Sequence, residues 1–250
     1  LWIILFFFVL TKQVILILSN NINKGAKMFS KELGDKLDQY HLLKHPFYKV
    51  YWNEGKLTRD IIKDYAEQYY QHVKAFPRYI SATHSICEDI EKRKILLENL
   101  QDEENKDGDH PKLWKNFAKA MGADENSIED VKPETFTKEM ISNFFTQARS
   151  SYAEGLASLY TYERQIPEIA ETKIQGLKKF YGVSSKEGLE FFEAHKSADV
   201  VHRAECEKLL DGLTKEEQEK AEKASLLTAK FLWNFLSGMT SKHKLDQVAA

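Results

Sequence analysis

The residues best suited to chemistry in this chain are two histidines and an aspartate on one face of a predicted helix. His195, Asp199 and His202 are spaced so that an α-helix stacks their side chains one turn apart. Two imidazoles and a carboxylate on one face can bind a transition metal such as iron, manganese or zinc. The alternative is a solvated polar face, because charged residues lie nearby in the sequence. Both interpretations stay open for this segment alone.

A second acidic segment offers two more ligand-like residues. Glu103 and His110 are seven positions apart, so a helix that continued through both would place them on one face. Gly108 and Pro111 indicate that the helix ends before His110, which makes the spacing only suggestive. Glu104 is an equally acidic candidate with a poorer offset. The alternative is an acidic helix end that runs into a solvated loop.

A third carboxylate lies in an apolar helical stretch. Glu163 follows Tyr160 and Tyr162, and a carboxylate buried there needs a partner. That partner is either a metal ion or a salt bridge, for example to Arg164 or Lys173. Taken together, three acids and three histidines would supply the six protein ligands of a dinuclear iron or manganese site in a helical bundle. The common pattern of two Glu-x-x-His pairs is missing from the sequence.

The elements that must position these residues are helices. From Met28 onward apolar residues recur at helical spacing, Thr58 is a suitable N-cap, and Ser184-x-x-Glu187 and Thr214-x-x-Glu217 are capping boxes. We therefore predict one all-α domain over residues 28–250, a compact bundle of about seven helices closed by a last long one. The expected ranges are about 30–43, 58–86, 88–106, 111–121, 134–165, 168–181, 185–210 and 214–240.

The composition agrees with a helical bundle and excludes several other classes. Only 11 glycines and 5 prolines occur, which argues against sandwiches, barrels, collagen-like chains and disorder. The 36 basic and 38 acidic residues nearly cancel, so we expect no nucleic-acid partner. The two cysteines, Cys87 and Cys206, are far apart and form no CxxC motif, which fits a reducing compartment such as the bacterial cytoplasm.

The first 27 residues differ from the rest. The segment 1–18 is apolar except for Thr11, Lys12 and Gln13, so it is a poor membrane span, and it lacks the basic start and cleavage site of a signal peptide. Codons for residues 24–26 can contain a bacterial ribosome-binding sequence just upstream of Met28. We interpret residues 1–27 as a translated leader outside the native protein, in which case no membrane contact is expected. A membrane anchor or a signal peptide are the alternatives.

The chain from about residue 40 to 235 resembles the TenA/PqqC-like proteins, which have the haem-oxygenase-like fold. The resemblance rests on motifs that occur in order along nearly the whole chain, and residues 1–27 have no counterpart. The matching stretches are His45–Tyr48, Gln68–Tyr79, Asp102–Asn105, Ala157–Glu163, Gln165–Pro167, Lys173–Gly176 and Ala198–His202.

The resemblance implies a metal centre and a dimer. Members of the oxidase branch are commonly homodimers and hold two metal ions with three carboxylates and three histidines, Fe/Fe or Fe/Mn being the pairs we expect. The metal-free branch that makes a pyrroloquinoline cofactor and the thiamine-degrading branch with its nucleophilic cysteine match less well. Carried over to this chain, the ligands would be Glu103, His110, Glu163, His195, Asp199 and His202.

The resemblance also implies a reaction. The most similar members supply p-aminobenzoate for folate synthesis and consume their own side chains, with O2 as co-substrate and an external reductant. The sacrificed ring would be Tyr48 and the nitrogen donor Lys173, while Tyr162, with Tyr160, would relay electrons or line the pocket. Judged from the sequence alone, Tyr48 reads as one more core aromatic and Lys173 as a solvated lysine.

Two other functions remain open at this stage. A dimetal oxidase of this kind can act on an external amine or fatty acid instead of its own tyrosine. An interaction protein is the other possibility, because some relatives engage death domains of host receptors, which would require secretion into a host. The charged stretch 214–224 is explained by a solvent-facing helix and indicates no binding patch of its own.

Overall fold

Helices make up nearly all of the fold. A computed structural model describes residues 28–106 and 108–247, apart from the side chains of residues 197, 198 and 247, and no strand occurs within those ranges. The predicted all-α bundle is confirmed, and the predicted leader lies outside the described residues. The α-helices are α2 (Phe29–Leu37), α3 (Arg59–Val73), α4 (Phe76–Ile86), α5 (Ile90–Glu103), α6 (His110–Ala120), α7 (Glu125–Asp130), α8 (Thr135–Ser150), α9 (Tyr152–Glu163), α10 (Ile166–Phe180), α11 (Lys186–Asp211) and α12 (Lys215–Lys242).

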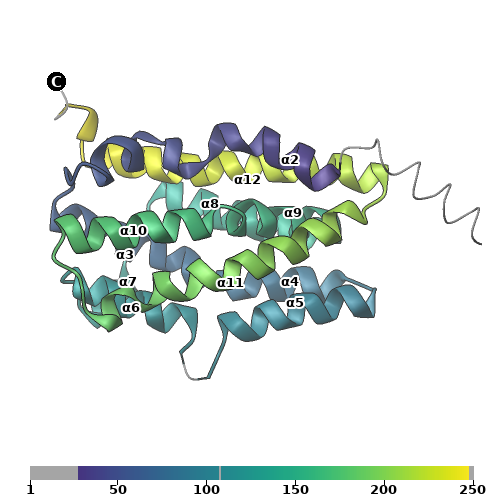
Figure 1. The fold of residues 1–250 in the computed structure, drawn as a ribbon, viewed down its shortest axis with the longest axis horizontal. Coiled ribbons are helices and arrows are strands. Elements are labelled where there is room, and N and C mark those ends of the chain that lie inside the picture. The colour runs from purple at the N-terminus through teal and green to yellow at the C-terminus, as the bar shows by residue number, and fades with distance from the viewer. Residues whose placement is uncertain (1–27, 107, 248–250) are drawn as a thin grey trace, which may run out of the picture.

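The helices run roughly along one long axis. In Figure 1, α2 and α12 lie side by side along one edge, α4 and α5 lie along the opposite edge, and α8, α9 and α10 fill the space between them. The long helix α11 crosses this arrangement and packs against α10, α6 and α9. In this way α11 spans the bundle and brings one helical face to several neighbours at once.

Two predicted helices are each divided in two. The expected helix 58–86 breaks before α4, because Pro77 has no N–H to donate and sits in the first turn of a new helix. The expected helix 134–165 breaks at Ser151, whose extended backbone ends α8 and whose hydroxyl accepts the N–H of Glu154 to cap α9.

The predicted caps are mostly confirmed. Thr58 accepts the N–H of Ile61, and Thr214 forms the expected capping box at the start of α12. The box at Ser184 was wrong by one residue, because the neighbouring Ser185 caps α11 by accepting the N–H of Gly188. Spacing alone does not distinguish two adjacent serines, since either hydroxyl can reach a free N–H of the first turn.

The helix α9 lies at the centre of the bundle and carries Glu163 at its end. Every residue from 153 to 163 is buried except Glu154, because α12, α8, α11 and α4 surround the helix. Its approach to α4 depends on Gly155, where a Cβ would collide with the side chain of Thr83. A helix covered on all sides presents any polar group to the interior, so Glu163 must find partners there.

A short π-helix positions Tyr48. It spans residues 47–52, which the periodicity analysis did not predict, and it is pinned to α10 through Trp52. The Trp52 indole N–H donates to the Thr172 carbonyl at 3.2 Å, and a Cβ at Gly176 would collide with the same indole. This close contact places the π-helix directly against the stretch of α10 that carries Lys173.

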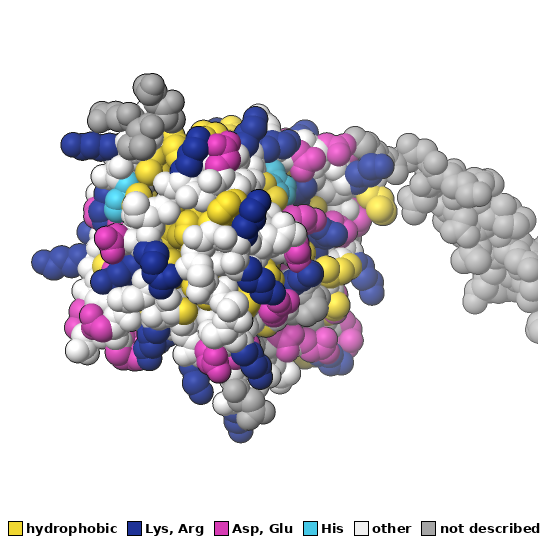
Figure 2. Space-filling model, turned by 60° about the vertical axis from the view of Figure 1, so that its left-hand side comes forward, with side chains coloured by type: hydrophobic (Ala, Val, Ile, Leu, Met, Phe, Trp, Pro, Cys, Tyr) yellow, Lys and Arg dark blue, Asp and Glu magenta, His cyan; other side chains and the backbone are white. Residues whose placement is uncertain are grey.

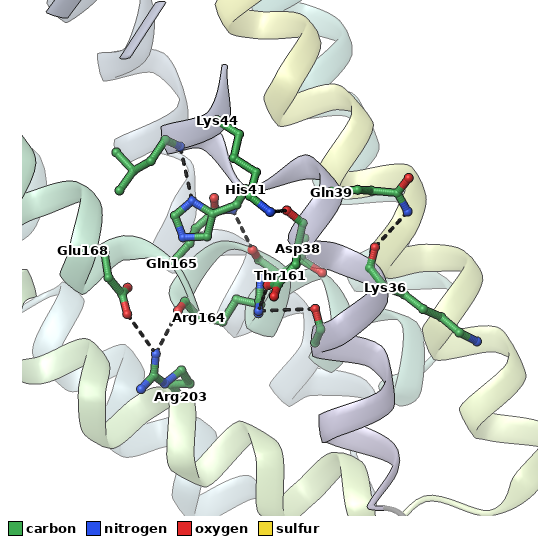
Figure 3. A network of polar contacts seen from close by, with 12 residues as sticks. Lys36, Asp38, Gln39, His41, Lys44, Thr161, Arg164, Gln165, Glu168 and Arg203 are labelled. Atoms are coloured by element: carbon green, nitrogen blue, oxygen red, sulfur yellow. Dashed lines mark hydrogen bonds and ion pairs between the residues drawn. The ribbon is translucent and has the colours of Figure 1, made fainter. Parts of the chain in front are cut away.

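A polar network joins the N-terminal segment to the bend between α9 and α10 (Figure 3). Arg164 donates to the Asp38 carboxylate at 2.7 Å, and the Gln165 side chain accepts the N–H of Leu42 at 2.9 Å. From α11, Arg203 donates to the Arg164 carbonyl at 3.2 Å. These bonds hold α2, α11 and the α9–α10 bend in fixed register, so the ligand-like residues on α9 and α11 keep their separation.

The surface carries charges of both signs. On the face drawn in Figure 2, basic and acidic side chains are interspersed over the described residues. Among those residues, none of the helices has the length and hydropathy needed to span a membrane.

Candidate metal centre

Glu103 and His110 meet although no helix connects them. Glu103 is the last residue of α5 and His110 the first of α6, and Glu103 Oε2 lies 2.9 Å from His110 Nδ1. Asp109 caps α6 by accepting the N–H of Lys112 at 2.8 Å. The prediction that the helix ends before His110 is confirmed, and the loop rather than helical spacing brings the two side chains together.

His195 completes a compact group with this pair. Its ring lies 4.2 Å from that of His110 between centroids and stacks on Phe191 at 4.0 Å. Nδ1 of His195 is 2.7 Å from the Phe191 carbonyl oxygen, so Nδ1 carries the proton and Nε2 is the free ligand atom. One ligand atom each of Glu103, His110 and His195 lies within 4.8 Å of the other two.

Glu163 is held by two donors rather than by a salt bridge. The Asn99 amide donates to Glu163 Oε1 at 2.7 Å, and the Cys206 thiol donates to Oε2 at 3.5 Å. The salt bridges considered for this residue are absent from the described contacts, because Arg164 pairs with Asp38 and Lys173 bonds Tyr65. Its carboxylate is 1 % exposed and faces other acids.

Asp199 and His202 lie next to Glu163 on the buried face of α11. Asp199 Oδ1 is 3.5 Å from His202 Nδ1, while Asp199 Oδ2 has no hydrogen-bond partner. Nε2 of His202 points outward and lies 3.1 Å from the Asp102 carboxylate. The solvated-face interpretation of these residues is wrong, because all of the six candidate ligands are buried.

The electrostatics of this cluster favour a bound cation. Burial, with the neighbouring Asp199 charge, raises the pKa of Glu163 to about 7. Burial, opposed by His202 and assisted by Glu103, raises the pKa of Asp199 to about 6. Burial lowers the pKa of His202, but the Asp199 and Glu163 carboxylates outweigh it and bring that pKa to about 9. Ionised carboxylates that lie close together in an apolar interior repel one another unless a cation binds between them and offsets their charge.

The residues fit a bound transition metal at Glu103, His110 and His195. Asp199 Oδ2 is buried and has no hydrogen-bond partner among the described residues. Buried polar atoms without partners are rare in folded proteins, and a carboxylate oxygen is of the kind that binds metal. Three imidazoles and three carboxylates form the oxygen and nitrogen donor set that suits iron and manganese.

A small cavity adjoins the cluster. Its volume is about 20 Å³, close to the room that one water molecule needs. Its lining includes the candidate ligand His195 together with Tyr162, Tyr48 and Lys173. The structure therefore brings the predicted sacrificial tyrosine and nitrogen donor to one enclosed space beside a candidate ligand.

Lys173 is buried among aromatic rings. Its ammonium nitrogen donates to the Tyr65 hydroxyl at 2.7 Å and lies 4.9 to 5.4 Å from the ring centroids of Tyr65, Tyr69, Trp114 and Phe192. The interpretation of Lys173 as a solvated lysine was wrong. Burial without a carboxylate partner lowers the pKa of this amine to about 7, so near neutral pH much of it carries a free lone pair.

Tyr65 connects the two candidate reactants. The hydroxyls of Tyr48 and Tyr65 lie 3.4 Å apart, and Lys173 Nζ is 6.0 Å from the Tyr48 ring centroid. Tyr69, one helical turn further along α3, stacks on Tyr65 at 5.5 Å and hydrogen-bonds Tyr162. Neither Tyr65 nor Tyr69 was singled out from the sequence, because an aromatic stripe at helical spacing is typical of a core.

Replacing Asp199 by asparagine tests the metal centre. We expect Asp199→Asn to stabilise the metal-free protein by about 1–3 kcal/mol at pH 8, because the ionised carboxylate is unfavourable in this interior. The same change should remove the rise in Tm that Mn(II) or Fe(II) gives the wild type by mass action. Thermal unfolding with and without metal measures both effects. The exposed Glu193 on the same helix gives a control, Glu193→Gln, that should change neither.

Metal binding that is undiminished in Asp199→Asn would exclude Asp199 as a ligand. A metal-free variant less stable than wild type would show instead that the carboxylate is held favourably, by His202 for example.

Comparison with known proteins identifies close relatives. Residues 63–233 match the model of a family described as iron-containing redox enzymes. A protein of Chlamydia muridarum named 4-aminobenzoate synthase is 41 % identical over 218 residues, which cover 85 % of this chain and 92 % of that protein. A protein of the same name from Nitrosomonas europaea is 39 % identical over 229 residues, covering 86 % and 92 %.

The fold has solved counterparts. The crystal structure of a TenA homologue from Pseudomonas syringae superimposes with a TM-score of 0.74 at 16 % identity, covering 85 % of this chain and 93 % of that one. At this level of identity the similarity establishes the fold.

Proposed function

This chain belongs to the family of iron-containing redox enzymes, with 4-aminobenzoate synthases among its relatives, and we propose that it makes p-aminobenzoate from its own Tyr48 side chain. The proposal has two parts. The cluster around His195 holds the metals, and the enclosed space between Tyr48 and Lys173 is where the product forms.

The metal ligands in this proposal are the six clustered residues. Glu103, His110 and His195 hold one ion, and Glu163, Asp199 and His202 provide the remaining donors beside it. Two irons, or iron with manganese, would supply oxidising equivalents there by reducing O2 with electrons from an external reductant. The protein contributes a dry interior, fixed ligands and a lysine kept partly neutral.

The small size of the cavity is the observation that carries the proposal. A space of about 20 Å³ has no room for an added aromatic or fatty-acid substrate. The tyrosine side chain already has the six ring carbons and the single attached carbon of p-aminobenzoate, and the lysine has the amine. Tyr48 and Lys173 both line this cavity. Their side chains therefore supply the ring and the amine that an external substrate would otherwise provide.

Each residue then has a defined part. The Cα–Cβ bond of Tyr48 breaks, O2 oxidises its Cβ to the carboxyl carbon, and Cα keeps a hydrogen in its place, so that a glycine residue remains. The nitrogen of Lys173 bonds to the ring carbon and the phenol oxygen leaves as water. Oxidation by O2 breaks the Cε–Nζ bond of Lys173 and leaves an aldehyde at Cε. Lys173 can use its lone pair because burial lowers its pKa to about 7. Its hydrogen bond to Tyr65 directs the amine toward the hydroxyl end of Tyr48.

Product stoichiometry distinguishes self-consumption from turnover. Protein grown with ring-13C tyrosine is loaded anaerobically with Fe(II), alone or with Mn(II), and then given O2 and a reductant. We expect at most one p-aminobenzoate with a fully labelled ring per chain, with matching mass changes confined to the peptides that contain Tyr48 and Lys173. Unlabelled product, or many equivalents from an added amine, would favour the external-substrate alternative.

A further inference from the structure

Asp102 lies outside the set of candidate ligands but contacts one of them. We propose that Asp102 is a positioning residue: it accepts the Nε2 proton of His202 and so presents Nδ1 of that ring to the metals. This inference rests on the proposed function, because it takes His202 as a ligand. The inference adds to the proposed function the ring nitrogen through which His202 binds metal, Nδ1, and the residue that selects this nitrogen, Asp102.

The geometry separates the two nitrogens of His202. Nε2 lies 3.1 Å from Asp102 Oδ2, and Nδ1 lies 3.5 Å from Asp199 Oδ1. The Asp102 side chain is 55 % exposed at the end of α5, whereas the Asp199 side chain is 4 % exposed. The ring of His202 therefore stands between the rim and the interior, with Nε2 toward the rim and Nδ1 toward the buried acids.

His195 on the same helix shows the opposite arrangement. Its Nδ1 donates to the Phe191 carbonyl at 2.7 Å, which leaves Nε2 for the metal. The two histidines on this helical face thus donate to different acceptors on the side away from the metals: His195 to a backbone carbonyl and His202 to a carboxylate. The outer acceptor fixes which nitrogen carries the proton, and a carboxylate in that place also makes the ring a stronger ligand.

Apart from this contact, the Asp102 side chain has little part in stabilising the fold. A half-exposed carboxylate that pairs with one histidine contributes little to stability, so its removal should leave the fold intact. The nearby acid Glu104 is exposed at the C-cap of the same helix and, among the described contacts, forms no hydrogen bond or ion pair with His202. It therefore serves as a matched control of equal charge.

The test compares metal binding by the wild type, Asp102→Ala, Asp102→Glu and Glu104→Ala, using Mn(II) alone as the probe. We expect Asp102→Ala to weaken one of two Mn(II) sites by about 10- to 100-fold, Asp102→Glu to restore part of the affinity, and Glu104→Ala to bind as the wild type does. Free Mn(II), measured by electron paramagnetic resonance during titration, gives the affinities without any assay of activity.

A second readout identifies the ligand atom. In the diamagnetic Zn(II)-loaded protein, 15N spectra of the histidines should show His202 bound through Nδ1 and protonated at Nε2, the assignment coming from His202→Gln. Binding through Nε2, or unchanged Mn(II) affinity in Asp102→Ala, would overturn the role of Asp102 and leave the metal centre standing. A wild-type chain that takes up no Mn(II) would overturn the proposed metal centre and this inference together.

Discussion

Replacing Tyr48 by phenylalanine is expected to abolish p-aminobenzoate formation and to leave the fold and the metal content unchanged. The hydroxyl makes one long contact, 3.4 Å to Tyr65, so its loss costs little stability. Product formation should stop completely, because phenylalanine has no phenol oxygen for an amine to replace and its ring is much harder to oxidise. The ring itself still fills the same buried volume.

The same π-helix provides the control. Tyr51 lies three residues after Tyr48, and its hydroxyl donates to Asp246 at 3.2 Å, away from the cavity. Tyr51→Phe should form p-aminobenzoate as the wild type does. Measurement requires the released product and the intact mass of each protein after exposure to O2. Product from Tyr48→Phe would show that the ring comes from another residue or from an added substrate.

The sequence indicated the candidate metal ligands more securely than the proposed reactants. Helical spacing correctly placed His195, Asp199 and His202 on one face, because that face lies within a single long helix. Glu103 and His110 come from two helices, and only the turn between them, which spacing cannot describe, sets their 2.9 Å contact. The family resemblance supplied what spacing could not, and the comparisons confirm that resemblance.

The environment of the reactants could not be predicted from the sequence. Lys173 lies on a helix with two other lysines, and nothing local distinguishes it from a solvated neighbour such as Lys178. Its burial depends on rings contributed by α3, α6 and α11, which meet only in the folded bundle. For the same reason Tyr65 could not be predicted from the sequence as the contact between Lys173 and Tyr48.

Replacing Lys173 should also have a large effect, on product formation and on the stability of the fold. Lys173→Met should eliminate p-aminobenzoate and at the same time stabilise the protein by about 1–4 kcal/mol near pH 7, as replacing unpaired buried charge by apolar groups often does. Methionine fills a similar volume among the aromatic rings but has no nitrogen to transfer. Chemical unfolding and product analysis on the same samples measure the two effects.

The stabilisation should depend on pH in a defined direction. Burial lowers the pKa of Lys173 from 10.5 to about 7, so between these values the unfolded chain binds a proton here that the folded chain lacks. The wild type therefore gains stability from this group as the pH rises through that window. The advantage of Lys173→Met should be largest at pH 7 and below, and it should shrink as the pH approaches 10.5.

Two variants separate these effects. Lys178→Met changes an exposed lysine on the same helix and should alter neither stability nor product. Lys173→Arg keeps a positive charge that does not lose its proton, so it should destabilise the fold and still give no product. If Lys173→Met proved less stable than the wild type, the ring contacts and the bond to Tyr65 would outweigh the cost of burial. If it still made p-aminobenzoate, the nitrogen would come from elsewhere.

The expected gain in stability is itself an argument about function. A chain selected only to fold would place an apolar side chain in this aromatic enclosure, because an amine there loses hydration and gains no carboxylate in return. What the enclosure provides is an amine that is partly neutral near pH 7 and lies 6.0 Å from the ring of Tyr48. Residues at reactive sites often lower the stability of a fold. Lys173 does so at a position where a neutral nucleophile is useful.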